Sequence, residues 1–270
     1  MSSLLVAGAE ATVQATAQAS ALVTAEGNAT LLGAFFSEIL GTATLILMGA
    51  GVCAAVTLPK SAAKNTDWLT IAFGWGFAVF AAVYIGAPSG AHLNPAVTLG
   101  QLVAGNDFAP GIAPSMSALL VYVAGQMIGA FLGAWGAYLV YKKHFDEAEP
   151  GTTRGIFCTA PAIRSYGWNL LTEAVGTFVL VGFVVASGRT PSGLGPLAVA
   201  LIVVAIGLSL GTPTGYAINP ARDLAPRIAH ALMPIKAKDS SDWAYSWVPV
   251  VGPLLGASLA ALIIPAILAL

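Results

Sequence analysis

The sequence contains very little charge. Only 9% of its 270 residues are Asp, Glu, Lys or Arg, whereas 57% are hydrophobic; typical soluble domains carry about 25% charged residues. A soluble protein of this length needs more charge to cover its surface, so we expect most of the outer surface to face lipid. The net charge of −1 and the isoelectric point near 6.3 argue against a nucleic-acid partner, which would require a basic patch.

Other chemically informative features are also scarce. Two cysteines, Cys53 and Cys158, are too few for a disulfide framework, and we interpret both as small apolar side chains. The sequence shows no Ser/His/Asp set, no metal-ligand cluster and no phosphate-binding glycine loop. We therefore expect no enzyme activity, no cofactor and no bound metal. Because no basic residue precedes Lys60, the N-terminus does not resemble a secretory signal.

Long apolar segments predict helices that cross a membrane. A helix needs about 20 apolar residues to cross the hydrocarbon core, and six segments meet or approach that length, although the fifth is short. These segments are Leu32–Thr57, Trp68–Gly86, Ser115–Tyr141, Trp168–Gly188, Gly195–Gly211 and Trp243–Leu270. We expect residues 1–31 to form a weakly structured tail or a surface helix, and residues 32–270 to form one domain.

Two stretches without charge are too long to be single helices. No Asp, Glu, Lys or Arg occurs between Asp67 and Asp107, or between Arg189 and Arg222. Each stretch contains Gly and Pro residues after its apolar segment, which predicts a spanning helix, a break and a short second helix. Irregular backbone at membrane depth is tolerated only inside protein or beside a water-filled cavity. Each break therefore indicates a cavity.

The two halves of the chain resemble each other in sequence. The pattern Glu-x-x-Gly-Thr occurs at Glu38 in the first apolar segment and at Glu173 in the fourth. The triplet Asn-Pro-Ala follows the second segment at Asn94 and the fifth segment at Asn219. The same features therefore recur in the same order, as expected for an internal repeat.

This repeat predicts the topology. Each half, at about residues 32–141 and 168–270, supplies three spans. Because three is an odd number, the second half must enter the membrane from the opposite side, which gives an inverted repeat. The predicted fold is an all-α membrane protein with six transmembrane helices and two re-entrant half-helices.

The two Asn-Pro-Ala segments are predicted helix starts that meet near the membrane midplane. Asn is a good N-cap, and Pro is favoured at the first helical position. The residues are Asn94, Pro95, Ala96, Asn219, Pro220 and Ala221. Facing helix N-termini carry partial positive charge, which repels cations and protons, while the Asn amides can donate hydrogen bonds to a neutral hydroxyl. This chemistry favours a passive pore for small uncharged solutes.

On these motifs the chain resembles the major intrinsic protein family, which comprises the aquaporins and glycerol facilitators, over about residues 32–268. The resemblance implies a right-handed bundle of tilted helices and a homotetramer with one pore per subunit. It also implies a multi-pass protein in the lipid bilayer of the cell membrane, with both termini in the cytoplasm. That orientation leaves most Lys and Arg residues outside, against the positive-inside rule.

The resemblance further implies a selectivity filter of four residues near the outer mouth. Its arginine corresponds to Arg222 and one of its aromatic residues to Tyr216, and Gly207 stands where water-selective members have a bulky His. In this interpretation, Trp75 and Tyr216 contact the carbon chain of a polyol, and Arg222 bonds its hydroxyls. Gly207 is expected to leave room for a solute wider than water.

The position of the filter tryptophan depends on the alignment. Trp75 matches the tryptophan of the glycerol facilitators only if this chain has one residue fewer before His92. An ungapped alignment instead puts Gly74 or Phe73 at that position.

Four charged residues complete the predicted site. Asp223 and Arg227 resemble the glycerol branch of the family, and their spacing also suits an i,i+4 ion pair within a helix; we expect this pair to brace the adjacent loop. Glu38 and Glu173 lie inside spans, where ionisable groups are usually functional. They could relay protons. The favoured interpretation is that they accept hydrogen bonds from the re-entrant loops and so turn the loop carbonyls toward the pore.

The sequence leaves three functions to compare. The expected one is passive conduction of glycerol and similar small neutral solutes, together with water. The second is a mainly water-selective channel of the same fold. The third, from another class, is a proton-coupled transporter of small solutes, which would need a paired ionisable site at the midplane.

Overall fold

The computed structural model describes residues 21–187 and 193–269. These residues form helices and connecting loops, with two isolated β-bridges. The α-helices are α2 (Leu31–Thr57), α3 (Trp68–Ile85), α4 (Pro95–Ala104), α5 (Met116–Val140), α6 (Lys142–Phe145), α7 (Arg154–Phe157), α8 (Tyr166–Ser187), α9 (Pro196–Leu210), α10 (Pro220–Leu232) and α11 (Val248–Leu268), and two 3-10 turns are η1 (Ala87–Ser89) and η2 (Trp243–Tyr245). The all-α prediction is confirmed.

The observed helices differ from the predicted segments at their ends. Within the described residues, five helices are long and apolar enough to cross a membrane. The fifth predicted span is shorter: α9 has 15 residues, or about 22 Å of helix against a hydrocarbon core of about 30 Å. The sixth span begins with η2, so its α-helix starts only at Val248. Two predicted segment ends, Gly188 and Leu270, and the tail up to residue 20 lie outside the described residues.

Side-chain caps explain where three of the long helices begin. The side chains of Thr30, Asp67 and Ser115 each accept a hydrogen bond from a backbone N–H three residues further along the chain. Such caps satisfy donors that have no partner inside the helix. The cap at Thr30 starts α2 at Leu31, one residue earlier than predicted.

Close helix contacts at glycine define two helix pairs. Helix α5 packs against α2, and α11 packs against α8. A Cβ atom added at Gly129 of α5 would lie 2.3 Å from the carbonyl oxygen of Ile39, and one at Gly256 of α11 would lie 2.1 Å from that of Ala174. Both glycines therefore bring the backbones together, as small residues do in membrane helices.

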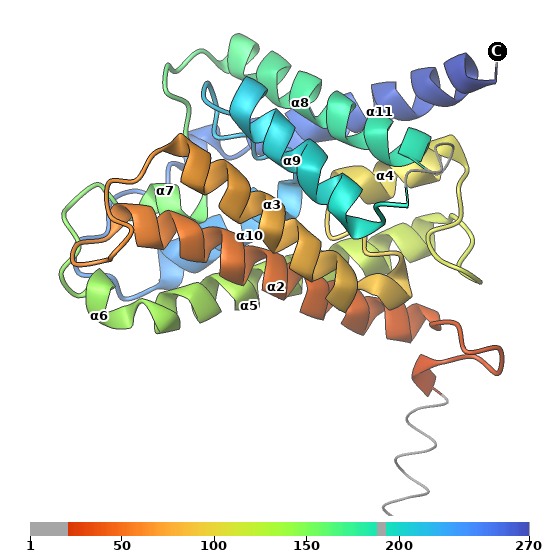
Figure 1. Cartoon of the computed structure of the whole chain (residues 1–270), viewed down its shortest axis with the longest axis horizontal. Coiled ribbons are helices and arrows are strands. Elements are labelled where there is room, and N and C mark those ends of the chain that lie inside the picture. The colour runs from red at the N-terminus through yellow and green to blue at the C-terminus, as the bar shows by residue number, and fades with distance from the viewer. Residues whose placement is uncertain (1–20, 188–192, 270) are drawn as a thin grey trace, which may run out of the picture.

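The half-helices connect the two halves of the chain. Helix α4 packs against α11, and α10 packs against α5, so each half-helix contacts the last helix of the other half. Helices α3 and α9 also pack together. In Figure 1, α4 lies toward the right of the bundle and α10 toward the left, and both described ends of the chain lie on the right. This arrangement brings the starts of α4 and α10 together between the long helices.

Candidate pore and selectivity filter

Both Asn-Pro-Ala segments start helices in the predicted manner. The Oδ1 atoms of Asn94 and Asn219 accept hydrogen bonds from the backbone N–H two residues further on, at 2.9 and 3.0 Å. Pro95 and Pro220 occupy the first helical positions, where a missing N–H costs nothing. The alanines that follow, Ala96 and Ala221, are completely buried.

The two segments also hold each other across the bundle. Nδ2 of Asn94 donates to the carbonyl oxygen of Ile218 at 2.8 Å, and Nδ2 of Asn219 donates to that of Leu93 at 2.8 Å. Each amide therefore binds the loop of the opposite half. Because each amide nitrogen carries two protons, the second proton of each side chain is available to a solute in the cavity beside it.

Glu38 supports the first re-entrant loop from behind. Its two carboxylate oxygens accept hydrogen bonds from the backbone N–H groups of His92 at 3.0 Å and Leu93 at 2.7 Å. The Ser89 hydroxyl at 2.6 Å and the Gln126 amide at 2.7 Å also donate to it. The carboxylate is fully buried, and these four donors compensate for the lost hydration.

Glu173 supports the second loop in the same way. Its carboxylate accepts from the N–H groups of Ala217 at 3.0 Å and Ile218 at 2.8 Å. In a trans peptide the carbonyl points opposite to the N–H, so the carbonyls of Tyr216 and Ala217 point away from Glu173. The loop achieves this with left-handed backbone at Tyr216 (φ 38°) and Ile218 (φ 43°). The first loop repeats this pattern at Ala91 and Leu93.

A cavity of about 150 Å³ runs past both Asn side chains. One water needs roughly 10–15 Å³ of such space, so the cavity can hold a file of small molecules. One part of its wall is apolar and includes Leu45, Val79, Val83, Leu180 and Val203. The other part consists of the two re-entrant loops, the Asn side chains and an arginine. The lining therefore combines a hydrocarbon surface with a polar strip.

Trp75 and Arg222 meet at one part of this lining. The Arg222 guanidinium carbon lies 3.9 Å from the centre of the Trp75 ring, and its Nη1 donates to the carbonyl oxygen of Phe157 at 3.1 Å. Gly74 instead faces a neighbouring helix, and Phe73 is 39% exposed on the outer surface. The structure thus places Trp75 at the cavity, as in the gapped alignment.

Gly207 lies beside the ring of Tyr216. It does not line the cavity, because the ring of Tyr216 occupies the space beside it: an added Cβ would lie 3.0 Å from Cζ of Tyr216. Trp68 packs edge-on against the same ring and donates from Nε1 to the Gly207 carbonyl at 2.8 Å. The space is therefore not left open for a wider solute. A side chain at position 207 would press on the Tyr216 ring, which itself lines the cavity.

Asp223 and Arg227 form an ion pair that is completely buried, with 2.8 Å between Nη2 and Oδ1. Asp223 accepts from the backbone N–H and the hydroxyl of Thr159, both at 2.7 Å. Arg227 donates to the carbonyl oxygen of Ser241 at 2.6 Å. The pair therefore ties α10 to two loops. One of these loops directly follows α7, whose last residue, Phe157, accepts a hydrogen bond from Arg222 through its carbonyl oxygen.

The contributors to this site that were not predicted include Gln126, Trp68 and the carbonyl of Phe157. Gln126 supports Glu38, and the only sequence signal for it is an amide side chain in the middle of an apolar segment. Trp68 fixes the Gly207 carbonyl, which no local pattern indicates. The Phe157 carbonyl binds Arg222 through the backbone, so its side chain carries no signal at all.

Comparison with known proteins decides the family. The model of the major intrinsic protein family matches residues 26–264. The chain belongs to this family. It is 49% identical over 234 residues to the probable glycerol uptake facilitator protein of Thermotoga maritima, a match that covers 85% of this chain and 97% of that relative. It is 51% identical over 229 residues to the glycerol uptake facilitator protein of Bacillus subtilis, covering 83% and 81%.

A solved structure agrees with this assignment. The aquaglyceroporin of Plasmodium falciparum superposes with a TM-score of 0.72 at 26% identity, covering 89% of this chain and 100% of that one. As a member of the major intrinsic protein family, the chain is an integral membrane protein with six transmembrane helices and two half-helices. Its two pore ends differ, because Arg222 follows Asn219 by three residues whereas Val97 follows Asn94 by three.

Proposed function

We propose that this member of the family is a passive channel for glycerol and similar small neutral solutes, and also for water. One observation carries the proposal: one cavity is lined both by apolar side chains of the long helices and by hydrogen-bonding groups of the re-entrant loops and Arg222. A polyol has carbon–hydrogen surface and hydroxyls along its length. It can therefore exchange water for both kinds of contact as it enters.

The proposed roles follow from the geometry. Trp75 and Tyr216 contact the carbon chain, while Arg222 and the two Asn amides donate to hydroxyl oxygens. Loop carbonyls accept from hydroxyl protons. A solute without hydroxyl groups loses hydration and regains little, because unpaired polar groups in a narrow site are costly.

Ion exclusion follows from the same groups. The N-termini of α4 and α10 and the guanidinium of Arg222 present positive potential to the cavity. No Asp or Glu lies among the described residues that line it. A cation therefore meets repulsion without a compensating carboxylate, and we expect protons and metal cations to be rejected.

The two alternatives have less support. A water-selective filter would place a bulky polar side chain at position 207, whereas this chain has Gly207 and seats an aromatic ring there. A proton-coupled transporter would need carboxylates at the midplane that face the solute. Glu38 and Glu173 are buried, bind backbone N–H groups and do not line the cavity. We propose that both are structural and that the chain catalyses no reaction.

The assembly and orientation are also proposals. We propose residues 32–141 and 168–270 as two repeats of one channel domain, in a homotetramer within the cell-membrane bilayer, with both termini cytoplasmic. The orientation rests on membership of the family and runs against the positive-inside rule.

Stopped-flow light scattering on proteoliposomes tests the function. We expect glycerol to enter vesicles that contain the protein much faster than protein-free vesicles of the same lipid. The uptake should not respond to an imposed pH gradient. Glycerol entry at the protein-free rate would refute the proposal, and uptake that follows the pH gradient would favour the coupled transporter.

A further inference from the structure

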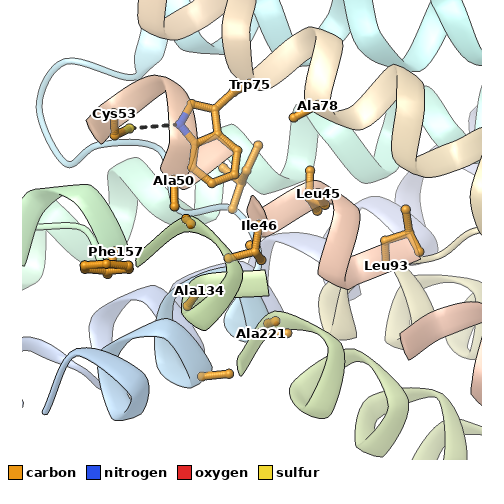
Figure 2. Packing of buried hydrophobic residues seen from close by; sticks show 14 of the residues in the cluster. Leu45, Ile46, Ala50, Cys53, Trp75, Ala78, Leu93, Ala134, Phe157 and Ala221 are labelled. Atoms are coloured by element: carbon orange, nitrogen blue, oxygen red, sulfur yellow. Dashed lines mark hydrogen bonds between the residues drawn. The ribbon is translucent and has the colours of Figure 1, made fainter. Parts of the chain in front are cut away.

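The filter tryptophan rests on one face of α2. Gly49 and Cys53 are four residues apart, so they lie one above the other on the same side of this helix. Nε1 of Trp75 lies 3.4 Å from Sγ of Cys53 and donates a hydrogen bond to it, as Figure 2 shows with a dashed line. Both partners are buried. The indole N–H, which is a donor only, is thus satisfied inside the protein and not by a solute.

Gly49 makes room for the six-membered part of the ring. A Cβ atom added at Gly49 would lie 2.2 Å from Cζ3 of Trp75 and 2.4 Å from both Cε3 and Cη2. These separations are far shorter than the 3.5–4.0 Å at which carbon atoms attract each other. The ring therefore occupies the volume that any side chain at position 49 would fill.

The indole is held from two sides. It contacts α2 at Gly49 and Cys53, and the Arg222 guanidinium carbon lies 3.9 Å from its ring centre. A ring displaced from α2 has to move toward Arg222 and the cavity that both residues line. The contacts with Gly49 and Cys53 of α2 therefore determine how far the tryptophan projects into the pathway of the solute.

We propose that Gly49 and Cys53 are positioning residues that set the solute cut-off of the filter by seating Trp75. This inference rests on the proposed glycerol-channel function. Gly49 supplies the space for the ring, and Cys53 fixes its rotation through the N–H···S hydrogen bond. Neither residue lines the cavity, so both act only through the tryptophan.

The test measures the glycerol, erythritol and water permeabilities of reconstituted vesicles and uses their ratios. A ratio does not depend on how many folded channels each vesicle holds, so a variant that merely folds less efficiently leaves it unchanged. The matched control is Gly51→Ala on the same helix, because an added Cβ at Gly51 meets nothing within 4 Å.

For Gly49→Ala we expect the glycerol-to-water ratio to fall about fivefold or more, the effect of a barrier about 1 kcal/mol higher. Gly51→Ala should keep the wild-type ratio. An equal ratio in the two alanine variants would overturn the role of Gly49. If wild-type vesicles themselves admit no glycerol, the proposed function fails. If they admit glycerol and only the two alanine variants agree in their ratio, the positioning role of Gly49 fails and the proposed function stands.

Cys53 is tested by a pair of variants. In Cys53→Ala the indole loses its acceptor, and we expect the discrimination between glycerol and the longer erythritol to weaken about twofold, in line with a net hydrogen bond of roughly 0.5 kcal/mol. Cys53→Ser keeps an acceptor of similar size and should restore the wild-type discrimination. Identical behaviour of the alanine and serine variants would refute the positioning role of Cys53.

Discussion

Gly207 offers a quantitative test of the filter, because its neighbourhood is tightly packed. An added Cβ would lie 3.0 Å from Cζ and 3.1 Å from Oη of Tyr216, and 3.2 Å from Cβ of Ala72. The Tyr216 ring is backed by Trp68 and by Gly211. It can therefore relieve the contact only by moving toward the cavity that it lines.

The size of the effect follows from the cost of overpacking, which is typically 1–3 kcal/mol. Gly207→Ala requires a shift of a few tenths of an ångström, so we assign it the lower value and expect glycerol permeability to fall about fivefold. Gly207→His inserts a whole ring, and we expect a loss of about a hundredfold. Water is narrower and should lose much less in both variants.

Stopped-flow measurements of glycerol and water flux on the same vesicles provide the assay. Gly167→Ala is the matched control, since an added Cβ there meets nothing within 4 Å. If glycerol and water permeability fell by the same factor in Gly207→His, the loss would reflect misfolding or a general block. That result would refute a filter in which Gly207 accommodates Tyr216.

Three further predictions concern the supports of the pore. In Glu173→Gln an NH₂ group replaces one of the two carboxylate oxygens that accept from backbone N–H groups. We expect the free energy of unfolding to fall by roughly 1.5–3 kcal/mol, seen as a lower unfolding temperature in detergent; an unchanged temperature would contradict the bracing role. Asp223→Asn should lower the free energy of unfolding by about 3–5 kcal/mol, because it leaves the Arg227 charge buried without its carboxylate partner. A double variant with Arg227→Met should be more stable than the single variant, and an equal or lower stability would refute the pairing argument. Burial raises the pKa of Asp242, but the hydrogen bond and charge of Arg164, together with the charges of Arg154 and Arg227, outweigh this effect, so the net pKa lies below its usual value. This partly exposed pair should therefore add less than about 1 kcal/mol to the free energy of unfolding at neutral pH and lose that contribution as the pH falls below about 4; Arg164→Gln should weaken that pH dependence in a thermal unfolding series, and an unaltered profile would count against the pair.

The spans and the breaks between them could be predicted from the order of the residues. Low charge and apolar segments of sufficient length require a lipid-facing surface, and Asn followed by Pro specifies a helix start through local backbone chemistry. These signals act over a few residues, so Asn94 and Asn219 could be assigned as helix starts without coordinates. The repeat then required the two starts to enter from opposite sides.

The contacts of each group could be described only from the folded chain. The Asn94 amide binds the carbonyl of Ile218, 124 residues away in the chain, and no local pattern specifies such a pair. The register of Trp75 and the packing of Tyr216 beside Gly207 depend on which side chains fill the space between helices. Packing of that kind is a property of several elements at once, so the chain had to be folded before the wall of its pore could be described.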